Sequence, residues 1–118
     1  MAESIVRRNA VVLKIDVEEM AQAIEDLWSP VEVARVNDQV VRLAKIQGEY
    51  HWHKHTNEDE LFYVLKGRIV LQLKDQPDIT LDEGQMAVVP KGMEHCPRSD
   101  EVSYLLVFEP HALVSRGD

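Results

Sequence analysis

The sequence predicts an all-β domain, an antiparallel sandwich or barrel, with one helix near its N-terminus. From residue 31 onward the chain is a series of short runs rich in β-branched and aromatic residues, and turn residues such as Gly67, Gly84 and Gly92 separate them. No helical segment lies between these runs, so no crossover could connect parallel strands. The 118 residues contain no internal repeat and suffice for one domain with its own core.

Composition limits the partners and the compartment. The net charge is -8 and the 13 lysines and arginines are scattered, which argues against nucleic acid and against an anionic membrane surface as partners. Cys96 is the only cysteine, so no disulfide can form within the chain, and a reducing, cytoplasmic setting is expected. Lys14 and Asp16 interrupt the apolar run after Arg7-Arg8, which makes it too short and too charged for an export signal or a membrane span.

The expected helix begins near residue 16. Asp16 and Glu19 have the spacing of a capping box, and Ser29-Pro30 should end the helix because proline disfavours helical geometry in the residue before it. Apolar residues recur between these limits at helical intervals: Val17, Met20, Ala21, Ile24, Leu27 and Trp28. This stripe favours a helix packed on the domain, and the alternative is that Leu27 and Trp28 contact a second subunit.

The remaining elements are expected to be strands. The runs 31–36 and 39–46 flank the turn-prone pair Asn37-Asp38, which predicts a hairpin. Further strands are expected at residues 50–55, 61–66, 68–74, 79–81, 86–90 and 102–108, with a turn at Pro97–Asp100. We expect residues 1–36 to form an N-terminal helix and strands that pack on a barrel of residues 37–118.

Three histidines at alternate positions, His51, His53 and His55, project to one face if their segment is a strand. Glu60 follows His55 by five residues and heads the next expected strand. Two imidazoles and one carboxylate that converge from adjacent strands form a facial set for a divalent metal ion and leave coordination positions open. The metal-free alternative is a buried polar network.

A second motif lies in the stretch GQMAVVPKGMEHC, residues 84–96. Gly84 opens a strand, Pro90 and Gly92 favour a tight turn, and His95 emerges just beyond that turn. A hairpin of this kind could bring a third imidazole back to the first group of ligands.

The two stretches resemble the two motifs of the cupin superfamily, over roughly residues 40–110. The first motif is H-x-H, four residues, Glu, six residues and Gly, matched by His53, His55, Glu60 and Gly67. Gly48 lies one residue closer to His53 than is usual in the family.

The second cupin motif is Gly, five residues, Pro-x-Gly, two residues, His, three residues and Asn. Its matches are Gly84, Pro90, Gly92 and His95. Ser99 stands in place of the usual asparagine, which is not a metal ligand in the family.

The resemblance implies a small cupin, a jelly-roll-like β-barrel built from two sheets, with the metal ligands His53, His55, Glu60 and His95. It implies one divalent ion, which among relatives is iron, manganese, zinc, nickel or copper. Imidazole and carboxylate suit several of these ions, so the identity stays open. His51 shares the strand face but lies outside the motif, so we expect it beside the ligands or in solvent.

The resemblance also implies a metal-dependent enzyme that acts on a small-molecule ligand, with dioxygenase or isomerase chemistry. No lysine or arginine is expected on the ligand face of a motif strand, which argues against a phosphosugar substrate. The alternative is a non-catalytic module that binds or senses a small molecule or a metal. An open, partly polar pocket would favour the enzyme, and an occluded pocket would favour the module.

Other residues have expected positions and roles. Cys96 should point away from the metal as a buried thiol, while Trp52 and Lys54 should face outward. The residues expected to line the pocket are Phe62, Met86, Val88, Leu106 and Phe108. Apolar residues occupy both faces of the runs 61–65 and 103–108, more than one small interior can bury, so a homodimer is expected.

Overall fold

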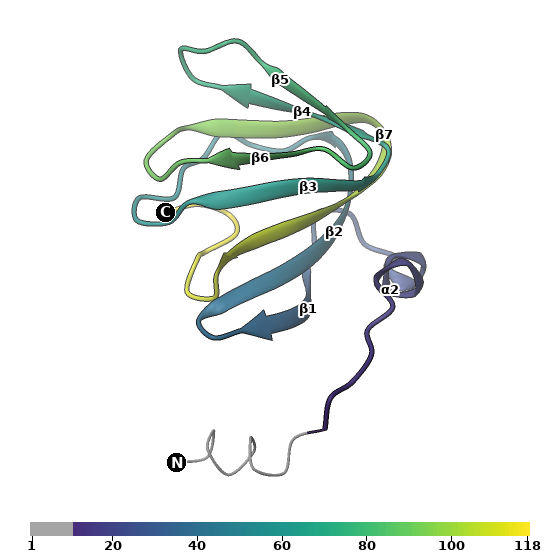
Figure 1. Cartoon of the computed structure of the whole chain (residues 1–118). Coiled ribbons are helices and arrows are strands. Elements are labelled where there is room, and N and C mark those ends of the chain that lie inside the picture. Colours follow the sequence, from purple (N-terminus) through teal and green to yellow (C-terminus); the bar gives the residue numbers. More distant parts are fainter. Residues whose placement is uncertain (1–10) are drawn as a thin grey trace.

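The computed structural model describes residues 11–118, and it confirms the all-β class with one N-terminal helix (Figure 1). The helix is α2 (Val17–Ala23). The strands are β1 (Val31–Val36), β2 (Gln39–Glu49), β3 (Glu60–Lys66), β4 (Arg68–Leu73), β5 (Ile79–Asp82), β6 (Met86–Val89) and β7 (His95–Pro110). The pair Arg7-Arg8 lies outside the described residues.

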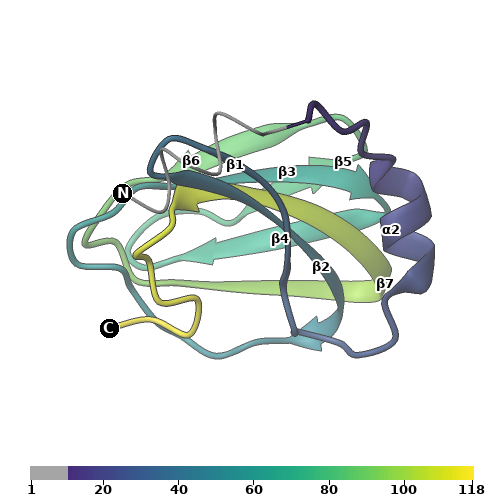
Figure 2. The same ribbon diagram turned by 90° about the horizontal axis from the view of Figure 1, so that it is seen from below.

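Antiparallel pairing joins the strands in the order β1-β2-β7-β3-β6, and β7 also pairs with β4, which pairs with β5. The long strand β7 takes part in both layers, because its first residues pair with β4 and its last residues pair with β3. The strand order does not close on itself, so the arrangement is an open jelly roll of two layers, which confirms the jelly-roll-like fold that was expected (Figure 2).

The apolar core lies between the two layers. Alternate side chains of β2, β3, β4 and β7 face inward, as the period of a strand requires. The buried core residues are Ala44, Ile46, Phe62, Val64, Ile69, Leu71, Leu73, Leu81, Val89, Leu105 and Val107. Glu60 and Glu109 continue the inward-facing rows at one end of β3 and of β7, and both are buried. A polar end of the interior therefore adjoins the apolar core.

The hairpin of β1 and β2 forms as predicted, with Asn37 at a φ of 57° in its turn. The predicted turn at Pro97–Asp100 is wrong, because these residues lie inside β7. The hydroxyl of Ser99 donates to the carbonyl of Arg68 at 2.6 Å, so a short polar side chain satisfies backbone groups within the sheet. The same residue types that favour turns can therefore occupy a strand when their hydroxyl groups find buried acceptors.

Gly67, at the sharp connection between β3 and β4, is required by its conformation and by its surroundings. Its φ is 91°, a region that side chains with a Cβ rarely adopt. A Cβ at this position would also lie 2.8 Å from the Cβ of Ser103. The glycine that ends the first motif therefore holds β3 and β4 close to the middle of β7.

The helix is shorter than predicted. Asp16 is its N-cap and accepts a hydrogen bond from the backbone N–H of Glu19 at 3.0 Å, as predicted, but α2 ends at Ala23. Tertiary contacts determine the path beyond it, because the backbone N–H of Trp28 donates to the carbonyl of Lys45 at 2.9 Å. Trp28 is thereby half-buried against its own domain, while Leu27 is 41% exposed, so the contact of these two residues with a second subunit stays a prediction.

The segment 50–55 is not a regular strand, but it runs antiparallel to the start of β7. His53 and His95 form an isolated bridge, with N–H···O distances of 3.0 and 2.8 Å in the two directions. The backbone N–H of Gly92 donates to the carbonyl of His55 at 2.8 Å. The two histidines of the first motif are thus held at alternate positions beside His95 without the full strand that was expected.

Candidate metal centre

Four polar side chains converge where β3 and β7 begin. The histidine–glutamate cluster consists of His53, His55, Glu60 and His95, and one candidate ligand atom from each lies within 4.8 Å of all the others. Glu60 and His95 are the first residues of β3 and β7, and the other two come from the segment 50–55. All four residues that the motif spacing singled out are therefore brought together.

The cluster presents buried donor atoms that no protein group satisfies. The Nε2 atoms of His55 and His95 each lie 3.3 Å from Oε1 of Glu60. These three residues are at most 5% exposed, and among the described residues none of the three atoms has a hydrogen-bond partner. Unpaired buried polar atoms are costly, and three that point at one another fit a cation between them. The donor set fits a divalent ion such as iron, manganese, nickel or zinc.

The protonation states suit metal binding. Burial lowers the pKa of His53 to about 4, and the neighbouring His95 and His55 add to this effect because like charges repel. Burial alone would favour the neutral form of Glu60, but the adjacent imidazoles of His55 and His95 outweigh it and hold the pKa of that carboxyl below its usual value. Near neutral pH, the site thus offers a carboxylate and, at His53, a neutral imidazole, the forms that bind metals.

Backbone carbonyls orient two of the three imidazoles. Nδ1 of His53 lies 2.9 Å from the carbonyl of His51, and Nδ1 of His95 lies 2.9 Å from the carbonyl of Met93. A proton on Nδ1 leaves the lone pair of Nε2 free for the metal. The imidazole of His51 is exposed and lies 2.9 Å from the carbonyl of Arg116. His51 therefore supports the cluster through its backbone, within the range of roles that the sequence left open.

A buried ion pair, which sequence reasoning missed, adjoins the cluster. Nη1 of Arg42 donates to Oε1 of Glu109 at 2.8 Å, and Glu109 is 1% exposed. Burial and the adjacent Glu60 carboxylate raise the pKa of Glu109, and Arg42 opposes this effect by stabilising the charged form. Both residues occupy inward positions of otherwise apolar strands, and this was the signal that could have identified them.

A cavity of about 50 Å³ lies beside the cluster, room for a few water molecules. Its walls are formed by Trp28, Pro30, Ala44, Ile46, Tyr50, His53, Glu60, Phe62, Pro97, Leu105, Val107, Glu109 and Ser115. Most of these residues are apolar and none is a lysine or an arginine. The rings of Trp28 and Tyr50 stack at a centroid distance of 4.7 Å and form one aromatic wall. The cavity is narrow and mainly apolar rather than open and polar.

Most of the expected pocket residues lie elsewhere. Phe62 lines the cavity, but Met86, Val88 and Phe108 are 57%, 56% and 40% exposed on the outer face of the sheet. Leu106 also faces outward, because its neighbours Leu105 and Val107 point into the core. The expectation of these four as lining residues was wrong because it chose the wrong strand parity.

The C-terminal segment 111–118 lies beside the loop that carries the histidines (Figure 2). Arg42 donates to the carbonyl of His111 at 3.1 Å. The backbone N–H of Asp118 donates to the carbonyl of Lys54 at 3.0 Å, and its carboxylate accepts from the N–H of Thr56 at 2.6 Å. These hydrogen bonds therefore hold the loop that carries the histidines against the rest of the domain.

The remaining sequence expectations concern residues around the site. Cys96 is fully buried and its thiol has a raised pKa because of burial, which agrees with an inert thiol that points away from the cluster. Trp52 is 50% exposed and Lys54 is exposed, as expected. Within residues 11–118 no helix is long and apolar enough to cross a membrane.

Comparison with known proteins identifies the relatives of this chain. The family model described as Cupin domain (Cupin_2) matches residues 39–108. The uncharacterized protein YdbB of Bacillus subtilis (strain 168) is 38% identical over 80 residues, which cover 68% of this chain and 71% of that protein.

Solved structures agree with this family. A cupin-2 domain containing protein from Shewanella frigidimarina NCIMB 400 has a TM-score of 0.79 and 38% identity, covering 81% of this chain and 93% of that one. The hydroquinone 1,2-dioxygenase from Sphingomonas sp. TTNP3 has a TM-score of 0.76 and 21% identity, covering 88% of this chain and 34% of that one. The second likeness concerns the fold alone.

Proposed function

Because the chain belongs to the cupin family, we propose that it binds one divalent metal ion through the histidine–glutamate cluster and acts as a metal-dependent enzyme on a small molecule. One observation carries the proposal: buried ligand atoms of His55, Glu60 and His95 point at one another without partners, directly beside a cavity that His53 and Glu60 also line. A structural role would not require unsatisfied donors beside an accessible space.

Four protein ligands leave positions open in a six-coordinate sphere. A bound metal ion at such a site can polarise an oxygen atom of a ligand or bind dioxygen. The residues of this chain then hold the small molecule: the aromatic wall of Trp28 and Tyr50 and the ring of Phe62 exclude water from one side. Glu109 also lines the cavity, and Arg42 holds its carboxylate in place.

The cavity favours a small, neutral or weakly polar substrate. Its walls are mostly apolar, and the nearest cation, Arg42, is already neutralised by Glu109 and does not line it. A phosphate or a sugar phosphate would therefore find no charged partner among the wall residues. Between the two reaction types expected from the family, this environment supports dioxygenase chemistry on a small apolar compound over isomerisation of a polar sugar.

The narrow cavity supports a second candidate, a non-catalytic module that binds or senses a metal or a small molecule. About 50 Å³ holds only a few atoms beside the ion, and Ser115 of the segment 111–118 forms part of the wall. An enzyme with a larger substrate would require this segment to move. The buried, unpaired Cys96 supports a reducing, cytoplasmic setting for either role.

Two measurements on protein purified without an affinity tag test the function. Elemental analysis should find about one equivalent of a divalent metal. Nitric oxide added to the iron(II) form should produce the electron paramagnetic resonance signal of an iron–nitrosyl complex, because a coordination position is open. A metal that binds but cannot take nitric oxide or exchange a water would overturn the enzyme and leave the binding module.

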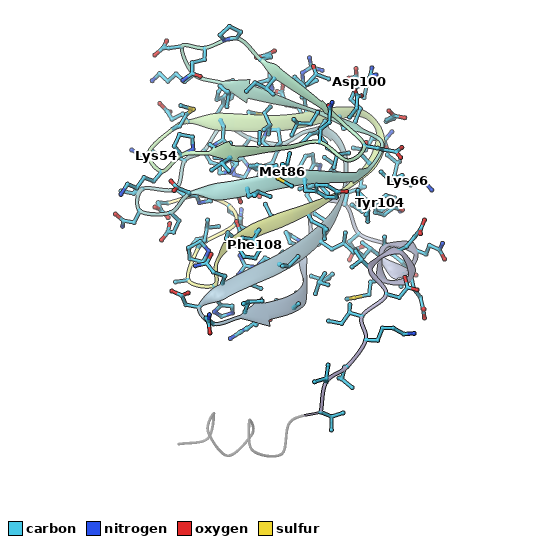
Figure 3. The ribbon with its side chains drawn as sticks, in the orientation of Figure 1. Lys54, Lys66, Met86, Asp100, Tyr104 and Phe108 are labelled. Atoms are coloured by element: carbon cyan, nitrogen blue, oxygen red, sulfur yellow. The ribbon has the colours of Figure 1, made fainter. Side chains whose placement is uncertain are left out.

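We also propose that the protein is a homodimer. The outer apolar face consists of Leu61, Tyr63, Met86, Val88, Leu106 and Phe108. Leu61 pairs with Val88 on one side and with Phe108 on the other, so these residues form continuous rows across β6, β3 and β7 (Figure 3). No charged residue interrupts these rows, and exposed apolar patches of this kind mark interfaces.

A second copy is the partner that the molecule itself favours. A sheet face is flat, and a two-fold axis would place the same apolar rows against each other. The extended segment that precedes α2 is also apolar, with Val12 and Leu13 99% and 75% exposed. A dimer could cover both features at once, and light scattering should then give about twice the chain mass of 13.5 kDa.

A further inference from the structure

The three imidazoles of the cluster are not held in the same way. Nδ1 of His53 and Nδ1 of His95 each lie 2.9 Å from the carbonyl of the residue two positions earlier. His55 is 2% exposed, yet its Nδ1 has no hydrogen-bond partner in the part of the chain that the structure describes. One ligand of the three therefore lacks the group that would fix its orientation and its tautomer.

Backbone pairing explains why His55 differs. The equivalent acceptor would be the carbonyl of His53, two residues earlier, but that carbonyl accepts the backbone N–H of His95 at 2.8 Å. The bridge between His53 and His95, which brings the third histidine into the cluster, thus directs this carbonyl at the backbone of His95, and the ring of His55 makes no hydrogen bond to it. A side chain has to supply another acceptor.

Two carboxylates lie next to His55. A ring nitrogen of His55 and carboxylate oxygens of Glu58 and Asp118 all lie within 4.8 Å of one another. Asp118 is already engaged, because its Oδ2 accepts the backbone N–H of Thr56 at 2.6 Å. Oε1 of Glu58 is buried and has no partner among the described residues. An unpartnered donor and an unpartnered acceptor are therefore neighbours behind the cluster.

We propose that Glu58 is a positioning residue for the metal, whose carboxylate accepts the Nδ1–H of His55 while Nε2 of that ring binds the ion. The inference rests on the proposed metal site and adds to it the residue that orients its most buried loop ligand. A carboxylate behind a metal-bound histidine fixes the tautomer and increases the basicity of Nε2, and losing such a partner typically costs ~10–100-fold in metal affinity.

The three residues of the acidic run 58–60 then have three different roles. Glu60 contributes its carboxylate to the cluster. Oδ1 of Asp59 accepts the backbone N–H of Lys91 at 2.8 Å and so joins the two motif loops. Glu58 turns back toward His55. An acidic residue in a turn is usually solvated, but Glu58 is half-buried and its Oε1 is buried.

The test compares three variants of the full chain with cobalt(II) as the probe metal. Glu58→Ala removes the acceptor, Glu58→Gln keeps a neutral acceptor, and Asp59→Asn is the matched control, since it makes the same charge change one residue away and keeps its oxygen. Competition with a chelator should give a dissociation constant raised ~10–100-fold for Glu58→Ala and less for Glu58→Gln, with Asp59→Asn within about twofold of the unmodified protein.

A second readout separates positioning from a general loss of structure. In the proton spectrum of the cobalt form, each bound histidine contributes one exchangeable, strongly shifted Nδ1–H signal. The unmodified protein should show three, and Glu58→Ala should lose one selectively, to rapid exchange with water. Three slowly exchanging signals and an unchanged dissociation constant in Glu58→Ala would overturn the inference while leaving the metal site intact.

Other outcomes have distinct meanings. Failure of the unmodified protein to bind cobalt would overturn the metal site itself and this inference with it. Two equivalents of cobalt per chain, with the second lost in Glu58→Ala, would overturn positioning in favour of a separate ion between Glu58 and Asp118. If Glu58→Ala does not fold, Glu58→Gln decides, because an affinity equal to that of Asp59→Asn would contradict the role of the carboxylate charge.

Discussion

The two faces of the same strands invert the usual distribution of polar and apolar groups. On the inner face, β2, β3 and β7 bury Arg42, Glu60 and Glu109, each at the end of an apolar row. On the outer face, β6 and β7 expose Met86 and Phe108 by 57% and 40% (Figure 3). Polar groups inside and apolar groups outside are each unfavourable for an isolated domain. Each anomaly therefore supports one of the two proposals, a bound ion on the inner face and a second chain on the outer face.

The largest expected effect is on the inner face. Replacing His53 and His95 together with alanine should abolish metal binding, because half of the candidate ligands are lost, while the β-sheet circular dichroism stays largely unchanged. His51→Ala is the matched control, since the hydrogen bond of the His53 ring is made to the backbone carbonyl of residue 51 and not to its side chain. Stoichiometric metal in the double variant, measured by elemental analysis, would remove the assignment.

The next effect concerns stability. Glu109→Leu should lower the free energy of unfolding by about 3 kcal/mol, because it leaves the mostly buried guanidinium of Arg42 without its partner. Adding Arg42→Met should recover most of that loss, since removing both charges leaves no unpaired ion. Urea unfolding of the two variants measures the difference. Equal stability of Glu109→Leu and the unmodified protein would show that this ion pair is not coupled to folding.

On the outer face the expected effect is on association rather than folding. Met86→Lys combined with Phe108→Lys should convert a dimer of about 27 kDa into a monomer, and unfolding of the monomer should change little, about 0.5 kcal/mol or less, as for other surface substitutions. Asp100→Lys places a charge change at an exposed position away from the outer apolar face and should remain dimeric. A monomeric unmodified protein at micromolar concentration would contradict the proposed interface.

The smallest effect is a pH dependence of the metal-free protein. The pKa of His53 is about 4 in the folded chain and 6.5 in an unfolded one, so between these values the unfolded state binds more protons. The free energy of unfolding should therefore fall as the pH is lowered from about 6.5 to about 4. Below about pH 4, His53 is protonated in both states and should cause no further change. Other carboxyl groups titrate here too, so the measurement is the difference between the unmodified protein and His53→Gln in urea unfolding. If the free energies of unfolding of the two proteins change in parallel with pH, the predicted contribution of His53 is contradicted.

The sequence predicted those parts of the molecule that depend on local spacing. The four cluster residues follow from two short motifs, and the cap at Asp16 and the turn at Asn37 follow from residue types within a few positions. The partners of the cluster were not predictable in this way. Arg42 and Glu109 are separated by 67 residues and meet only because β2 and β7 pair in one register.

Strand parity caused the other errors. The same alternation places either Phe62 or Leu61 inside, and apolar residues on both faces remove the contrast that would decide between them. Four of the five expected pocket residues were assigned to the wrong face for this reason. The helix end at Ala23 likewise depends on a contact of Trp28 with β2, which no local pattern records.

Strand β7 sets the order in which this molecule can be assembled. It begins with His95 and nearly ends with Glu109, and it pairs with β2, β3 and β4. Such contacts between distant segments form slowly and late in folding. Before β7 forms, the only candidate ligands in place are those between His53 and Glu60, which are too few to retain an ion firmly. The third imidazole, His95, arrives with the last strand. We therefore expect the proposed metal ion to bind only to the finished fold, and refolding should proceed at the same rate with a chelator as without one.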